Sequence, residues 1–135
     1  MSLKCRVASA AEIDQIVDLA RRAMGTEMPP EYWRWKYFDN PAGPSGVVVA
    51  LDGDRMVGLI SAFAVPMWIR GNRRVGVQMG HNELLKPYRS RGAYFQLCDV
   101  MVGEFLSDPA IDLCFGVAIQ EMRDLSTVLM GFSDV

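Results

Sequence analysis

The segment Gln78–Leu97, QMGHNELLKPYRSRGAYFQL, is the feature that most constrains the fold of this 135-residue chain. It predicts a strand that Pro87 stops, because proline has no N–H to continue a β-ladder. A turn at Arg89–Gly92 follows, and from Ala93 onward apolar residues recur at helical spacing. These apolar residues are Leu97, Met101 and Phe105, flanked by Cys98 and Val102. The pattern therefore predicts a strand, a short basic turn and a helix.

This turn has the features of an anion-binding site. The first N–H groups of a helix have no partner within the helix, and the helix dipole adds about half a positive charge there. Gly92 permits close backbone approach and a positive φ, while Arg89 and Arg91 add donors suited to phosphate. A solvated arginine turn that merely begins a helix is the alternative, and on this stretch alone both interpretations stay open.

Composition narrows the classes of function. Half of the residues are hydrophobic and 22% are charged, as in ordinary globular domains, and the length predicts a single domain over residues 1–135. The formal net charge of -2 argues against a nucleic-acid-binding protein, which usually has a basic excess. Basic residues cluster at 70–74 and 86–91, which suits a small anionic ligand better than a polyanion.

The sequence also predicts a cytoplasmic protein with no membrane partner. No apolar run approaches the ~20 residues of a membrane span, and the N-terminus lacks a signal-peptide pattern. The three cysteines are odd in number and match no metal spacing, which fits reduced thiols. The single histidine excludes an HExxH zinc site, so no metal is expected.

The remaining segments alternate between strand and helix patterns. Residues 9–12 (SAAE) form a capping box, which predicts an amphipathic helix that ends at Gly25. Its apolar face comprises Ile13, Ile16, Val17, Ala20 and Met24. A second helix is expected at 31–39. Within the strand expected at 56–69, Pro66 marks a bulge or an edge position. Strands are expected at 4–8, 47–51, 56–69, 73–85 and 112–119, and a last helix at 121–130.

This order predicts an α/β fold. The last two strands are joined through a helix, so they should be parallel neighbours, whereas the preceding strands follow tight turns and should be antiparallel. The aromatic segment YWRWKYF at 32–38 has two interpretations, core packing or a wall of an apolar substrate pocket. The second interpretation assigns Tyr32, Trp35 and Tyr37 to substrate binding.

The sequence PYRSRG resembles the acyl-CoA pyrophosphate loop of the GNAT N-acetyltransferase superfamily. The core of that loop is Q/R-x-x-G-x-G/A, and Arg89, Gly92 and Tyr94 occupy its three positions. The flanking segments WRWKYFDNP and VVVALDGDRMVG also look like one acyltransferase branch, so the resemblance covers nearly the whole chain. It implies a GNAT-like, three-layer fold in the order β-α-α-β-β-β-α-β-α. In this fold a mixed, mostly antiparallel sheet carries helices on both faces, and the family's usual final two strands are expected to be absent from this chain.

The resemblance implies direct acyl transfer from acetyl-CoA, or another acyl-CoA, to a small-molecule primary amine. A backbone N–H near Leu84 and Leu85 would hold the oxyanion, and the pyrophosphate would lie over residues 89–93. The implied cofactor-binding residues are Leu84, Leu85, Lys86, Arg89, Ser90, Arg91, Gly92, Ala93, Tyr94 and Gln120.

The base in this mechanism must lie on the strand before the turn. His81 and Glu83 are two residues apart and share a face of a regular strand, so either is a candidate catalytic base, directly or through a water. The alternatives are a hydrogen-bonded structural histidine and an ordinary salt-bridge glutamate.

Three departures from the family's pattern bear on catalysis. The chain stops at Val135, Thr127 stands where a tyrosine often acts as general acid, and Gln120 replaces a frequent asparagine. They leave open a CoA-binding or sensory module without turnover. A fragment completed by another chain, such as a homodimer partner, is also left open.

Overall fold

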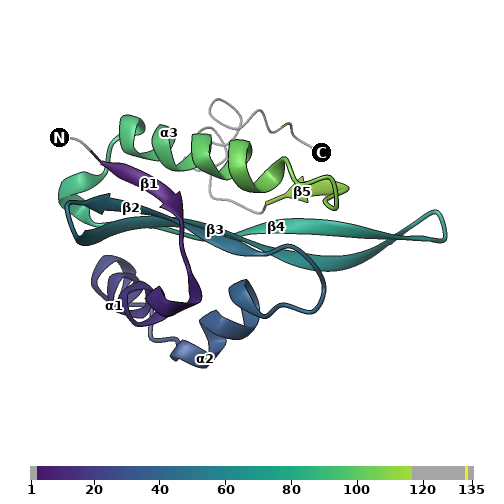
Figure 1. The fold of residues 1–135 in the computed structure, drawn as a ribbon, viewed down its shortest axis with the longest axis horizontal. Helices are drawn as coiled ribbons and strands as arrows, with labels where there is room; N and C mark the ends of the chain where they lie inside the picture. Colours follow the sequence, from purple (N-terminus) through teal and green to yellow (C-terminus); the bar gives the residue numbers. More distant parts are fainter. Residues whose placement is uncertain (1–2, 117–132, 134–135) are drawn as a thin grey trace.

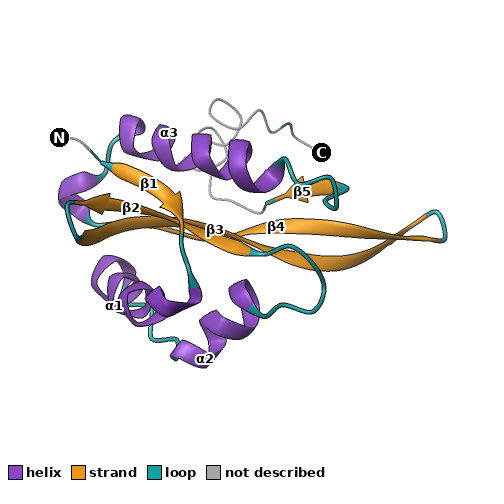
Figure 2. Cartoon of the chain, in the orientation of Figure 1, coloured by secondary structure: helices purple, strands orange, loops and turns teal. Residues whose placement is uncertain are grey.

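The computed structural model describes residues 3–116 and 133 and places a five-stranded sheet between two layers of helices (Figure 1). Helices α1 and α2 cover one face of the sheet and α3 covers the other (Figure 2). The expected mixed α/β fold is confirmed. The strands are β1 (Lys4–Val7), β2 (Gly46–Asp52), β3 (Arg55–Ile69), β4 (Asn72–Leu84) and β5 (Leu113–Phe115), and the helices are α1 (Ile13–Met24), α2 (Pro30–Trp33) and α3 (Arg91–Val100).

The strands lie in sequence order, β1-β2-β3-β4-β5. The first four are antiparallel, and β5 joins β4 in parallel, as the helical crossover between them requires. β5 pairs with β4 only over Gly76–Gln78, and the Asp112 carboxylate accepts the Val75 N–H at 2.7 Å just before this pairing. The second half of β4 lies beyond these three pairs.

Helix α1 forms as its sequence predicts at both ends. The Glu12 carboxylate accepts the Ser9 N–H at 2.9 Å, and Gly25 ends the helix with a φ of 70°. Its buried residues are Ile13, Ile16, Leu19 and Ala20. Met24 corrects the expected apolar face, since it is 63% exposed: it is the last helical residue, and its sulfur lies beside Arg89 rather than in the core.

The aromatic segment is not one continuous α-helix over 31–39. The helix α2 covers Pro30–Trp33 and continues as a wider π-helical turn over Arg34–Phe38. Trp33 and Tyr37 are fully buried against the sheet, whereas Trp35 is 61% exposed. Core packing is therefore confirmed for Trp33 and Tyr37, whereas a role of this segment as the wall of a substrate pocket stays a prediction.

Pro66 lies at an edge of the sheet. β2 pairs with β3 only as far as Ala62, so Pro66 has a ladder neighbour on one side only, where it faces Val75 in register. The bulge between β3 and β4 lies elsewhere, between Ile60 and Ala62.

Several predicted features lie outside the described residues. These are Gln120, Thr127, the strand residues 117–119 and the helix at 121–130. No helix within the described part of the chain is long and apolar enough to cross a membrane.

Candidate active site

The site is built around an irregularity in β4. Where the ladder between β3 and β4 shifts register, two residues of β4, Gly80 and His81, lie opposite the single residue Ser61. The Ser61 hydroxyl donates to the His81 carbonyl at 2.8 Å, and the Tyr37 hydroxyl accepts the His81 N–H at 3.3 Å. The bulge is thus fixed by two side-chain hydroxyls that bond its backbone.

Only glycine fits at the first position of this bulge. A Cβ on Gly80 would collide with Tyr37 Oη and would lie 2.9 Å from Ser61 Oγ. Burial raises the pKa of Tyr37 to about 12, so its hydroxyl keeps its proton at neutral pH.

Glu83 is a buried carboxylate beside the bulge. Only 4% of its surface is exposed. Its Oε1 atom accepts the Thr26 hydroxyl at 3.2 Å and lies 3.6 Å from His81 Nδ1, so the structure brings together the two residues that the sequence singled out as bases. Its other oxygen, Oε2, has no hydrogen-bond partner within residues 3–116 and 133. Oε1 therefore has a hydrogen bond, whereas Oε2 is buried without one in this part of the chain.

Side chains from α2 and the turn after it surround the ring of His81. The Trp33 ring stacks on it at 4.6 Å between centroids and 35° between planes, and Tyr32 Oη lies 3.3 Å from His81 Nε2. The Lys36 ammonium donates to Tyr32 Oη at 2.6 Å. Tyr32 and Tyr37 therefore both contact His81.

Sequence reasoning missed Trp33, Lys36 and Thr26 as members of this site. The spacing of Tyr32 from Lys36, and of Trp33 from Tyr37, is i,i+4, which places each pair on one side of a helical turn. That periodicity is the signal in the sequence that points to Trp33 and Lys36, and it does not extend to Thr26.

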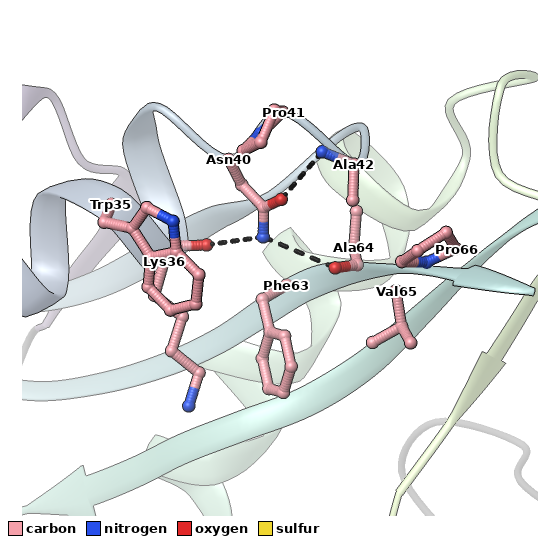
Figure 3. Close-up of a pocket in the computed structure, with 9 residues that line it drawn as sticks. All are labelled: Trp35, Lys36, Asn40, Pro41, Ala42, Phe63, Ala64, Val65 and Pro66. Atoms are coloured by element: carbon pink, nitrogen blue, oxygen red, sulfur yellow. Dashed lines mark hydrogen bonds between the residues drawn. The ribbon is translucent and has the colours of Figure 1, made fainter.

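Trp35 lies apart from His81 and lines a different hollow (Figure 3). This cavity of about 260 Å³ lies between the π-helical turn, the loop at 40–42 and β3. The Asn40 side chain supports its wall, donating to the Lys36 and Ala64 carbonyls at 3.0 and 3.3 Å. Its lining is Trp35, Lys36, Asn40, Pro41, Ala42, Phe63, Ala64, Val65 and Pro66.

The predicted basic turn is shorter than expected, because α3 begins at Arg91 rather than at Ala93. Ser90 caps the helix, its hydroxyl accepting the Ala93 N–H at 3.1 Å. Gly92 therefore lies within the first helical turn and has no positive φ. Among the described residues, a Cβ there would meet only Ser90 Oγ, at 4.0 Å, so these residues leave the space beside Gly92 open. The N–H groups of Arg91 and Gly92 have no partner within the helix.

Arg89 is exposed, but its guanidinium group bonds two backbone carbonyls of the protein itself. Its Nε donates to the Leu84 carbonyl at 2.9 Å, and its Nη2 donates to the Ala23 carbonyl at 3.3 Å, near the end of α1. Two of its three nitrogens thus tie the end of β4 to α1. The Leu85 N–H bonds the Val57 carbonyl at 2.9 Å, and because successive N–H groups of a strand alternate in direction, the Leu84 N–H points away from β3.

The remaining predicted cofactor-binding residues lie around this helix start. Lys86 is exposed in a 3₁₀ turn, Ala93 is buried against the core, and Tyr94 is half-buried, which raises the pKa of its hydroxyl. Within the described residues, no group of three or more His, Cys, Asp or Glu side chains could hold a metal ion.

Comparisons with known proteins bear on this arrangement. The model of a family described as an acetyltransferase (GNAT) domain matches residues 4–119. No curated protein matches the chain.

Several solved structures share the fold. An aminoglycoside acetyltransferase from an uncultured soil metagenomic sample has a TM-score of 0.74 at 17% identity, over 100% of this chain and 95% of that one. A predicted acetyltransferase with acetyl-CoA, from Clostridium acetobutylicum, has a TM-score of 0.75 at 17% identity, over 99% and 92% of the two chains. A second soil aminoglycoside acetyltransferase, in complex with sisomicin, has a TM-score of 0.73 at 14% identity, over 98% and 91%.

Proposed function

Since the chain belongs to the GNAT acetyltransferase family, we propose that it transfers an acetyl group from acetyl-CoA to the primary amine of a small molecule. The observation that carries this proposal is the buried Glu83 carboxylate, whose Oε2 atom has no hydrogen-bond partner among the described residues. A buried carboxylate oxygen without a partner is costly, which suits an atom that receives a proton during a reaction.

The start of α3 fits the pyrophosphate of the cofactor. The Arg91 and Gly92 N–H groups lie at a helix N-terminus, and the open space at Gly92 lets an anion approach the backbone. Arg91 adds a positive charge there. Arg89 supports the loop by donating to the backbone carbonyls of Leu84 and Ala23.

The acceptor amine is activated by the chain's own residues. An amine attacks only as the free base, so a neighbouring group must take its proton, and Glu83 and His81 lie at the end of β4 for that task. Bound acetyl-CoA supplies a thioester carbonyl that is reactive toward amines. The Leu84 N–H, which points away from β3, is the donor for the carbonyl oxygen.

We also propose a cytoplasmic location and a domain that acts without nucleic acid, membrane or metal. Cys5, Cys98 and Cys114 are free thiols, and burial raises the pKa of both Cys98 and Cys114 to about 11, which keeps them protonated and unreactive. We propose a homodimer as the assembly in which a partner chain would add strands to the sheet.

Thermal unfolding tests cofactor binding. A ligand at a hundred times its dissociation constant stabilises a protein by about 2.7 kcal/mol, which is several degrees for a chain of this length. We expect acetyl-CoA to raise the melting temperature more than dephospho-CoA does. Gly92→Ala should weaken this rise, because its methyl group lies where the anion approaches. Gly103→Ala, whose methyl group meets no atom of the described residues within 4 Å, should not. No rise in the unsubstituted chain at millimolar acetyl-CoA would contradict the proposal.

Release of free CoA, measured over a panel of amines, tests turnover. The panel includes aminoglycosides, because two similar structures are aminoglycoside acetyltransferases. Amine-dependent release supports the transferase. Binding of acetyl-CoA without release for any amine favours the alternative of a CoA-binding module without turnover.

A further inference from the structure

We propose that Tyr32 and Lys36 are positioning residues that hold His81 in a single neutral tautomer, and that this leaves Glu83 Oε2 as the atom that takes the proton from the acceptor. This inference rests on the proposed function for the identity of the acceptor. The tautomer of the His81 ring is inferred only from the contacts around that ring.

The direction of each hydrogen bond follows from the chemistry of the groups. A lysine ammonium has donors only, so Tyr32 Oη accepts from Lys36 Nζ across their 2.6 Å contact. The tyrosine's own proton is then directed at His81 Nε2, 3.3 Å away. A neutral imidazole has one donor and one acceptor nitrogen, so Nδ1 carries the ring proton.

This tautomer fits the other side of the ring. His81 Nδ1 lies 3.6 Å from Glu83 Oε1, so its N–H faces a carboxylate oxygen rather than opposing a second lone pair. The Thr26 hydroxyl donates to the same oxygen at 3.2 Å. Oε1 therefore faces two donors, and Oε2 faces none within the described residues.

The proton transfer that follows is balanced. One N–H bond of the acceptor ammonium breaks, its electron pair stays on nitrogen, and the proton forms an O–H bond with Glu83 Oε2. The amine is then neutral and its lone pair is available for attack. His81 keeps its Nδ1 proton throughout and orients the carboxylate.

Lys36 is held in place by more than its bond to Tyr32. Its ammonium lies 4.3 Å from the ring centroid of Phe63, 5.0 Å from that of Tyr32 and 5.6 Å from that of Tyr37. Three rings, one each on α2, the π-helical turn and β3, therefore surround the cation. The ordered cation is what makes Tyr32 a donor to His81 rather than an acceptor.

The tautomer can be measured without any substrate. His81 is the only histidine in the chain, so a long-range ¹H–¹⁵N correlation spectrum of the uniformly ¹⁵N-labelled protein shows one imidazole ring. At a pH where the ring is neutral, we expect Nδ1 at the protonated shift and Nε2 at the unprotonated shift. A ring with its proton mainly on Nε2 would overturn the inference.

Two substitutions test the roles of Tyr32 and Lys36. Tyr32→Phe removes the donor and Lys36→Met removes the cation that orients it, so each should give a mixture of the two tautomers. Tyr88→Phe is the matched control, because its hydroxyl bonds Asp52 at 2.6 Å rather than His81. Lys36→Arg keeps a cation at this position and should keep the single tautomer. A pure Nδ1–H ring in both Tyr32→Phe and Lys36→Met would overturn the role of the pair.

The outcomes separate this inference from the proposed function. If the protein releases no CoA with any amine, the proposed function fails while the spectrum still reads the tautomer. If it is active but its ring carries the proton on Nε2, only the inference fails. In the active protein, Tyr32→Phe should lower kcat by about three- to ten-fold with an unchanged KM for acetyl-CoA, as expected for one neutral hydrogen bond.

Discussion

The two halves of β4 differ in the regularity of their strand pairing and in their buried polar groups. Residues 72–78 pair in register with β3, and the last three of them also pair with β5. Residues 79–84 contain the bulge, the buried Glu83 carboxylate and a second buried atom without a partner, Asn82 Oδ1, within the described part of the chain. Regular pairing and satisfied polar groups characterise a strand that only supports the fold. Irregular pairing and buried polar atoms without partners are expected where a strand carries a functional site.

The largest expected difference between the halves is catalytic. Glu83→Gln keeps the shape of the side chain but removes its basicity, and loss of a general base lowers kcat by roughly 10² to 10⁴-fold. We expect this loss of CoA release with an unchanged thermal shift by acetyl-CoA. Glu104→Gln, an exposed change, is the control. Activity retained by Glu83→Gln within a few-fold would show that this half of β4 holds no base.

Substitutions of two glycines, one in each half of β4, compare how tightly the two halves are packed. Gly80→Ala places a methyl group against Tyr37 Oη and Ser61 Oγ, two hydroxyls that hydrogen bonds fix in place, so it should cost about 2–3 kcal/mol of unfolding free energy. Gly76→Ala meets the flexible end of Met67, which can move aside, and should cost under about 1 kcal/mol. Chemical denaturation measures both, and an equal loss in the two variants would remove the distinction.

The hydroxyl of Tyr37 tests whether the bulge depends on its side-chain bonds. Tyr37→Phe leaves the His81 N–H without its acceptor at 3.3 Å, and an unsatisfied buried donor costs about 1–3 kcal/mol. We expect a loss of stability in this range by chemical denaturation. Tyr88→Phe, whose hydroxyl bonds Asp52 near the surface, should lose less. A neutral result for Tyr37→Phe would indicate that Ser61 alone fixes the bulge.

Local sequence patterns predicted the structural features that are determined by residues close together in the chain. The capping box at 9–12 and the end of α1 at Gly25 follow from short-range chemistry. The parallel pairing of β4 with β5 follows from the helix that connects them. The shared face of His81 and Glu83 follows from the two-residue period of a strand, and the structure brings the two together. Their catalytic role stays a prediction.

What the sequence did not predict depends on contacts between distant segments. Tyr32 meets His81 across 49 positions, and Thr26 meets Glu83 across 57, so no local period reveals them. The hydrogen bonds of Arg89 depend on carbonyls of β4 and α1, and the basic composition of its loop does not indicate them. Helix α3 starts early because Ser90 caps it. The sequence alone does not distinguish this role from that of a turn residue, since serine favours both positions.

The smallest expected effect lies at the outer half of β4. Arg73 and Arg74 are exposed and belong to the part of the β3–β4 hairpin that extends beyond the helices (Figure 1). Exposed substitutions away from caps and buried polar groups usually change stability by about 0.5 kcal/mol or less, so Arg73→Gln and Arg74→Gln should leave both unfolding and CoA release unchanged. Because these arginines face Trp68 and Met67 across the ladder, a loss of turnover here would assign the hairpin to acceptor binding. In that case function would extend along the whole strand, and the contrast between its halves would concern packing alone.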